Sequence, residues 1–385
     1  MDLVFRLSAF GSTCLLCGRL LNPVVVPSAF ELSGAYVHTD LRREVTGAEG
    51  AALQGGGLAV GDEASDTPHG VGIEGAFVKS APKGTGAGTP ALEVALGVVG
   101  GFSHTEADTL DPSGAVVLNA SGDARFETFW LRARAPVALR GSAEAAVEIP
   151  FNRSRDLVVY GPGNLYESPE RRNLYSYTTS AALGYRYRGD GWEGAGALRW
   201  AHASTQNNTG LAYANGSGSL WGLEANFIRG LGAFRGSVSG SGLKGSLGFK
   251  EGYAPDFVEV TPSREFVRGS AKIEISRPTR ALVPFFSAEW VGSRTPYWDF
   301  SAPLNTETLF HDLGLAQQFH SNELFLGLGI QLKLRELLTA SVAGVYRSGR
   351  ETVDLLPTSA NPGSGSLSVS RTGWGFTVGF TATVR

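Results

Sequence analysis

The segment from Leu174 to Arg188 alternates between two kinds of residue at every position. One set is mainly apolar or aromatic and comprises Tyr175, Tyr177, Thr179, Ala181, Leu183, Tyr185 and Tyr187. The other set is small or charged and comprises Ser176, Thr178, Ser180, Ala182, Gly184, Arg186 and Arg188. Because successive side chains of a β-strand point to opposite sides, the segment predicts a strand with one apolar face and one polar face.

Tyrosines stand at both ends of the apolar face, with smaller groups between them. Tyrosine settles at a membrane–water boundary, since its ring is apolar and its hydroxyl is polar. The path from Tyr175 to Tyr187 is roughly 40 Å at about 3.3 Å per residue. A strand tilted by about 40° then covers about 30 Å of depth, which brackets an outer-membrane apolar band of about 25 Å. The segment therefore predicts a strand that crosses a lipid bilayer.

Composition decides which kind of membrane structure is compatible with this strand. The chain of 385 residues contains no apolar run near the roughly 18 residues that a membrane helix needs. A closed barrel also gives every backbone N–H and C=O group in lipid a hydrogen-bond partner. Its alternating strands fit a mean hydropathy of -0.02. A net charge of -3, without any basic run, argues against a nucleic-acid partner.

Residues 1–29 predict a signal peptide for Sec export to the periplasm, which leaves 30–385 as the barrel. Arg6 provides a minimal charged region, and an apolar region of 12 residues follows from Leu7 to Gly18. Both cysteines, Cys14 and Cys17, lie within this leader. The mature chain would then have no thiol, as suits an oxidising compartment. A redox or metal role for Cys-x-x-Cys is the alternative, but no second pair and no helical pattern accompany it.

The connections between alternating segments follow a regular rhythm. The short ones are 81–90, 138–141, 189–190, 229–232, 278–281 and 334–337, and the long ones are 41–69, 107–123, 154–172, 206–217, 243–264, 296–321 and 350–370. This rhythm predicts an all-β fold, a single closed antiparallel transmembrane β-barrel of about 14 strands with short periplasmic turns and long extracellular loops. The range is 12–16, because 308–319 and 245–254 are candidates for further strands. Pro150 and Pro284 lack ladder donors and are expected at strand ends or bulges.

The polar faces carry charges of both signs. The predicted lumen-lining charges are Arg132, Arg134, Glu144, Glu148, Arg186, Arg188, Glu193, Arg199, Arg268, Lys272, Glu274 and Glu289. Facing lipid at mid-depth, each would cost roughly 2–4 kcal/mol, so they are expected to point inward. Two interpretations stay open: a structural ladder of cross-strand ion pairs that stiffens the wall, and the lining of a conduit.

Catalytic and ligand motifs are sparse. His202 and Ser204 follow the outward Trp200, and this His-x-Ser pair resembles the outer-membrane phospholipase A pattern, in which nucleophile and base face the outer leaflet. The Asn-Gly that follows in that family is absent here, and Asn226 on the next strand faces inward in the predicted register. Chance polarity near a loop is the simpler explanation. The histidines have no metal-ligand spacing, and a glycine-rich match at 240–245 has no crossover helix, so no catalytic residue, metal or cofactor is predicted.

Segment 296–321 combines apolar and aromatic residues within a long connection. Its aromatic and aliphatic members include Trp298, Phe300, Leu309, Phe310 and Phe319. They are consistent with a short amphipathic element folded into the lumen as a constriction, or alternatively with one more hairpin.

Residues 30–385 resemble Gram-negative outer-membrane β-barrels in general architecture and in an aromatic girdle. The girdle residues are Tyr175, Tyr177, Tyr185, Tyr187, Trp192, Trp200, Trp221, Trp290 and Trp374. About 14 strands with an apolar loop element are similar to FadL-type and phenol-degradation-type transporters. The end Val384-Arg385 departs from the terminal aromatic residue usual in such barrels.

This resemblance implies a bacterial outer-membrane location, with the lipid bilayer and its lipopolysaccharide, the barrel-insertion machinery and a small-molecule solute as partners. The expected function is a porin-like channel for passive diffusion of small solutes, with hydrophobic ones among the candidates, rather than an enzyme. The alternatives are a plugged structural or adhesive barrel that acts through its external loops and, less favoured, a lipid esterase using His202 and Ser204. Oligomeric state and the particular solute stay open.

Overall fold

A computed structural model describes the backbone of residues 29–46, 63–66, 69–80, 93–110, 116–138, 140–160, 170–209, 212–253, 257–277, 281–297, 316–335, 338–356 and 365–384. The predicted signal peptide lies almost wholly outside these residues, since the first strand begins at Ala29. Trp298, Phe300, Leu309 and Phe310 of the predicted inward loop also lie outside them.

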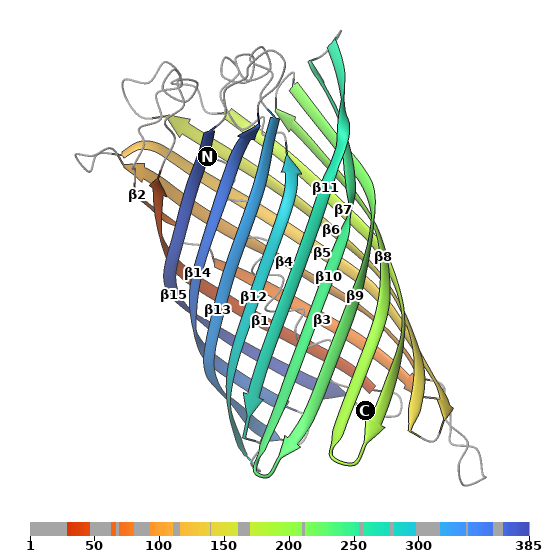
Figure 1. Cartoon of the computed structure of the whole chain (residues 1–385). Helices are drawn as coiled ribbons and strands as arrows, with labels where there is room; N and C mark the ends of the chain where they lie inside the picture. Colours follow the sequence, from red (N-terminus) through yellow and green to blue (C-terminus); the bar gives the residue numbers. More distant parts are fainter. Residues whose placement is uncertain are drawn as a thin grey trace.

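Within these residues the chain forms one antiparallel sheet (Figure 1). Its strands are β1 (Ala29–Thr46), β2 (Glu63–Asp66), β3 (His69–Ser80), β4 (Glu93–Leu110), β5 (Val116–Ala138), β6 (Gly141–Tyr160), β7 (Glu170–Gly189), β8 (Trp192–Thr209), β9 (Ala212–Leu231), β10 (Phe234–Tyr253), β11 (Phe257–Ser276), β12 (Leu282–Tyr297), β13 (Ala316–Arg335), β14 (Leu338–Leu356) and β15 (Gly365–Val384). In the described part of the chain, no helix is long and apolar enough to cross a membrane.

The sheet closes on itself through its first strand. β1 pairs with β15 from Phe30↔Val384 to Thr46↔Ser368, and on its other side it pairs with β3 and β2. β2 and β3 occupy one strand position, since both lie between β1 and β4. The 15 segments therefore make 14 strand positions (15 - 1), which confirms the predicted closed barrel and its even strand count.

The predicted long loops are shorter than expected in several places, for example in 107–123, where β4 ends at Leu110 and β5 starts at Val116, and two of the loops almost vanish. β8 continues to Thr209 and β9 starts at Ala212, while β10 continues to Tyr253 and β11 starts at Phe257. Segments 206–217 and 243–264 are therefore mostly strand, and 245–254 is the end of β10 rather than a further strand. Figure 1 shows β10 and β11 extending past their neighbours. Ladder hydrogen bonds use the backbone alone, so pairing overrides the low β-propensity of these Ser-, Asn- and Gly-rich segments.

Side-chain exposure alternates along the strands as the sequence predicts. On β13, Leu324 and Leu328 are 39% and 70% exposed, whereas Glu323 and Phe325, on either side of Leu324, are 6% and 5% exposed. Exposed apolar residues on a closed barrel form the surface that lipid covers, so the buried set points into the barrel.

The two prolines interrupt pairing in different ways. Pro284 lies just past the last β11–β12 pair, Ser276↔Phe285, and its carbonyl accepts a hydrogen bond from Arg277 N at 3.0 Å. Pro150 instead lies within β6, and the β6–β7 ladder has no pair between Glu148↔Ser180 and Phe151↔Tyr177. The missing proline N–H accounts for both positions.

Candidate channel interior

A continuous ladder of ion pairs crosses the inward face of β5 to β8 near the short turns. Arg134 Nε lies 2.7 Å and Arg186 Nε 2.5 Å from Oε1 of Glu144. Arg186 also pairs through Nη1 with Glu193, whose second oxygen lies 3.0 Å from Arg188 Nε. Five of the predicted interior charges are thus joined across four strands.

A second ladder, on β5, β6, β8 and β9, lies further from the short turns. Arg132 Nη2 lies 3.4 Å from Glu148 Oε1, and Arg199 Nη2 lies 2.7 Å from Glu148 Oε2. Arg199 Nε then approaches Glu224 Oε1 at 2.6 Å. Together the two ladders hold five arginines and four glutamates, a net of one positive charge (5 - 4). Because nearly every charge has an opposite neighbour, these ladders brace the wall and leave little net field across it.

A third charged cluster lies on β13 to β15 and is almost fully shielded from solvent. Arg347 Nη2 donates to Glu323 Oε1 at 2.6 Å, and Arg371 Nη1 lies 3.8 Å from the same oxygen. The residues Glu323, Arg347 and Arg371 are 6%, 4% and 3% exposed. Our sequence analysis missed Arg371 as an interior residue because it was placed at a loop border. The alternation with the outward Trp374 would have assigned it inward.

Apolar side chains also occupy the inward face, which the alternation did not predict. Trp130 and Leu220 are 7% and 2% exposed, although both lie on the same faces as the charged ladders. The guanidinium carbon of Arg132 lies 5.3 Å from the ring centroid of Trp130, and that of Arg347 lies 5.4 Å from that of Phe325. The interior therefore combines aromatic surface with cations that are themselves paired with carboxylates.

The remaining predicted interior charges are less connected. Lys272 Nζ lies 3.4 Å from Glu274 Oε2 on its own strand and is in register with the buried Glu289 on β12. Arg268 lies in β11, but its side chain is not among those described.

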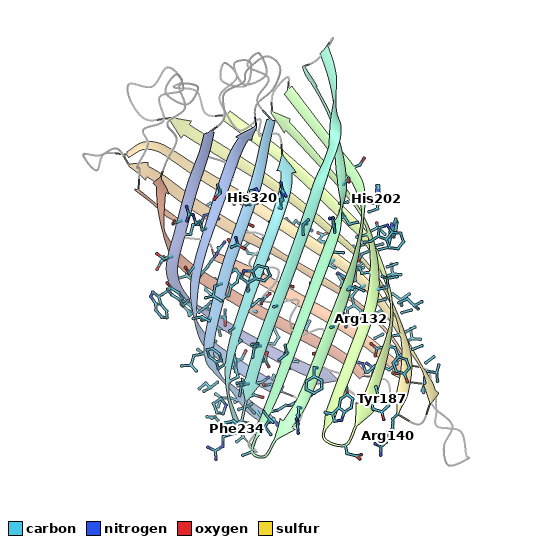
Figure 2. All side chains as sticks on the ribbon, in the orientation of Figure 1. Arg132, Arg140, Tyr187, His202, Phe234 and His320 are labelled. Atoms are coloured by element: carbon cyan, nitrogen blue, oxygen red, sulfur yellow. The ribbon has the colours of Figure 1, made fainter. Side chains whose placement is uncertain are left out.

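The predicted girdle residues separate into two groups along the outer face. Near the short turns, Tyr187 and Trp192 have ring centroids 5.3 Å apart, and the Trp192 ring lies 5.7 Å from that of Phe227. Figure 2 shows Tyr187 and Phe234 at this end and His202 and His320 toward the other. Further along, Trp200 is in register with Trp221.

The group further from the short turns, called the upper group, also includes two exposed tryptophans, Trp290 and Trp374. The ring centroids of Trp374 and Tyr346 lie 4.7 Å apart. From Trp192 to Trp200 the path along β8 rises about 20 Å, at about 3.3 Å per residue and a tilt of about 40°. That separation is close to the apolar band of about 25 Å of an outer membrane. Tyr175 and Tyr177 lie in β7, but their side chains are not described.

The strand register separates His202 and Ser204 from Asn226. His202 is in register with Thr179 on β7 and Ser219 on β9, whereas Asn226 is in register with Ala195, near the other end of β8. Asn226 also lies on the inward face, with Glu224 and Ile228. The geometry gives no support to the triad-like arrangement. Within the described residues, no group of three or more His, Cys, Asp or Glu side chains is arranged to hold a metal.

Comparison with known proteins finds likeness in fold alone. No family model matches the sequence, and no curated protein matches it. A deletion mutant of the TodX monoaromatic hydrocarbon channel superposes with a TM-score of 0.53 at 10% identity, covering 92% of this chain and 90% of that one. The P. putida toluene transporter TodX gives 0.51 at 12% identity, with coverages of 94% and 91%.

The chain thus has the fold of outer-membrane hydrocarbon channels over nearly its whole length, and the predicted resemblance to that transporter group is confirmed as a likeness in fold. A P. aeruginosa FadL homologue overlaps with a TM-score of 0.48 at 12% identity, covering 93% of this chain and 90% of that one. That overlap is too low to carry further conclusions.

Proposed function

We propose that this barrel is a passive channel for small apolar solutes in the bacterial outer membrane. The observation that carries the proposal is the presence of large apolar side chains on its inward face, among them Trp130, Leu220 and Phe325. An apolar solute that packs against an apolar lining gains about 25 cal/mol per Å² of its own surface removed from water.

The charged ladders have a complementary part in this proposal. Because the five arginines and four glutamates of the two ladders nearly cancel, they line the route without presenting a strong field to a neutral solute. The likeness to TodX, a toluene transporter, supports the same solute class. In this proposal residues 1–29 direct export, the insertion machinery assembles the barrel, and the long connections face outward.

Uptake by intact cells tests the proposal. A strain without its own hydrocarbon channels, expressing this barrel, is expected to take up radiolabelled toluene faster than the same strain without it. Uptake of a disaccharide should stay unchanged. Equal acceleration of both solutes would indicate a general pore, and no acceleration of toluene would contradict the proposal.

A second candidate function is a closed barrel that serves as an envelope anchor or adhesin. It is favoured by the nearly complete burial of Glu323, Arg347 and Arg371, since charges lining an open aqueous pore are normally wet. A barrel of this kind would speed the uptake of no solute, and the same uptake experiment separates the two candidates.

A further inference from the structure

The outward face changes character abruptly above the upper aromatic residues of β12 to β15. Below that level the described outward side chains are mostly apolar, with Phe286 and Trp290 on β12, and Leu324 and Leu328 on β13, all exposed. Above it they are polar. We define the β12–β15 patch as Arg294, His320, Asn322, Arg350, Thr352 and Ser370.

The strand register joins these six residues into one surface. Arg294 pairs with His320, which pairs with Thr352, and Asn322 pairs with Arg350, which pairs with Ser370. Directly paired residues on one face have Cβ atoms about 5 Å apart. Figure 2 places His320 toward the end of the barrel opposite Phe234 and Tyr187. The patch therefore lies just beyond the apolar band, at the depth of lipid headgroups.

The two arginines flank β13 from β12 and β14. Two strand spacings and an offset of two residues put their Cα atoms about 12 Å apart, with His320 and Asn322 between them. Arg294, Asn322 and Arg350 are exposed. Above the aromatic level, no described outward side chain of β12 to β15 is acidic. Arg294, His320, Arg350 and Thr352 each already take part in an interaction, so a ligand would join an existing polar network.

The corresponding surface on β4 and β5 has a different charge balance. There Arg125 Nη2 lies 2.5 Å from Glu127, and His104 Nδ1 lies 2.7 Å from Asp123. These residues also stand just above exposed apolar side chains, Phe102 and Phe129. Arg125 and His104 on that side each lie beside a carboxylate, whereas the six residues that define the β12–β15 patch include two arginines and no carboxylate.

We propose that the β12–β15 patch binds the phosphate groups of a phosphorylated glycolipid in the surrounding leaflet. Arginine presents paired N–H donors that match phosphate oxygens, and clusters of basic residues at headgroup depth attract anionic lipids. The histidine, amide and hydroxyl groups supply further donors around the same point. The apolar residues directly below, Trp290 and Leu324, would contact the acyl chains of the same lipid. The assignment rests on the proposed outer-membrane location but not on channel activity.

The test uses the intact purified barrel in detergent and two lipids, phosphorylated lipid A and the same lipid A with its phosphates removed. Bound lipid is counted by native mass spectrometry over a titration. We expect the phosphorylated form to bind about tenfold more tightly or better, given the strength of charge-assisted hydrogen bonds. Equal binding of the two lipids would overturn the proposal. This comparison needs no variant, so it is independent of any folding defect.

Variants then locate the site. The double variant Arg294→Ser/Arg350→Ser is expected to lose the preference for phosphorylated lipid, and Arg125→Ser on β5 should keep it. Loss in the Arg125→Ser control, or retention in the double variant, would overturn the assignment to this patch. If an equal concentration of inorganic phosphate displaced lipid A, the patch would be a site for free phosphate, and the assignment to a lipid would be overturned. Because binding is measured without transport, a negative result in the uptake experiment leaves this test unaffected.

Discussion

Arg186 on β7 joins Glu144 on β6 through a hydrogen bond of 2.5 Å from Nε to Oε1, and the two residues are 42 positions apart in sequence. Arg186 also bonds to Glu193 on β8, so a single guanidinium links three strands on the inside of the barrel. This arginine is the central member of the ladder nearest the short turns.

Replacing Arg186 with alanine should therefore destabilise the barrel. The side chain of Arg186 is 5% exposed, and its loss leaves Glu144 and Glu193 with one arginine each. We expect a loss of about 3 kcal/mol in the free energy of unfolding, the lower end for breaking a buried pair. Urea titration in lipid vesicles, followed by tryptophan fluorescence, measures it. Arg188→Ala, at a side chain 49% exposed, should cost less than about 1 kcal/mol. Equal losses would contradict the role given to Arg186.

The lipid-facing assignment predicts a dependence on depth. Leu183 is 69% exposed and lies near the middle of the apolar band. Changing it to arginine should lower the free energy of unfolding by about 2–4 kcal/mol. Val137 is 63% exposed and lies near the end of β5. The same change there should lower the free energy of unfolding by at most about 1 kcal/mol. The free energy of unfolding in vesicles checks both. A larger cost at Val137 would place the bilayer elsewhere on the barrel.

The two faces of the wall should respond differently when a tryptophan is removed. Trp130→Ala takes an aromatic ring from the interior and is expected to change the rate of toluene uptake severalfold. Trp221→Ala removes a ring of the same size from the outer face, where it is 58% exposed, and should leave the rate unchanged. Uptake is compared at equal amounts of folded barrel, judged by heat-dependent mobility on gels. Identical rates for the two variants would argue against a route past Trp130.

Lipid hydrolysis should not depend on Ser204. Asn226 lies far along β9 from the pair formed by His202 and Ser219, and on the opposite face, so it does not serve the His-x-Ser pair as the third group that orients a catalytic histidine. We expect Ser204→Ala and the unmodified barrel to release fatty acid from phospholipid vesicles at the same background rate. A clear fall on substitution would revive the esterase interpretation.

Alternation in segments such as Leu174 to Arg188 was enough to predict the barrel, its approximate strand count and the faces of most strands. A period of two along a strand is a local property that the sequence carries directly. The extent of β8 to β11 was not predictable in this way. Backbone pairing with a neighbour, not side-chain identity, extends those strands through 206–217 and 243–264.

The interior was predicted less completely than the wall. Charges such as Glu144 and Arg186 were assigned inward by alternation, but which of them meet depends on the register between strands, which sequence patterns leave open. Trp130 and Leu220 were missed because an alternating pattern treats inward positions as polar. In a closed barrel, an apolar side chain can face either the interior or the lipid and be shielded from water in both places.

Single-channel recording tests the central claim most directly. The refolded barrel is inserted in a planar bilayer and compared with a variant in which residues 298–315, which join β12 to β13, are replaced by a short Gly/Ser linker. If the barrel is a channel and this segment narrows it, which is one of the two interpretations of its sequence, discrete current steps appear in the unmodified protein and grow in the variant. Silence in both proteins, with folding verified, would contradict a conducting interior and leave the closed barrel as the account of this chain.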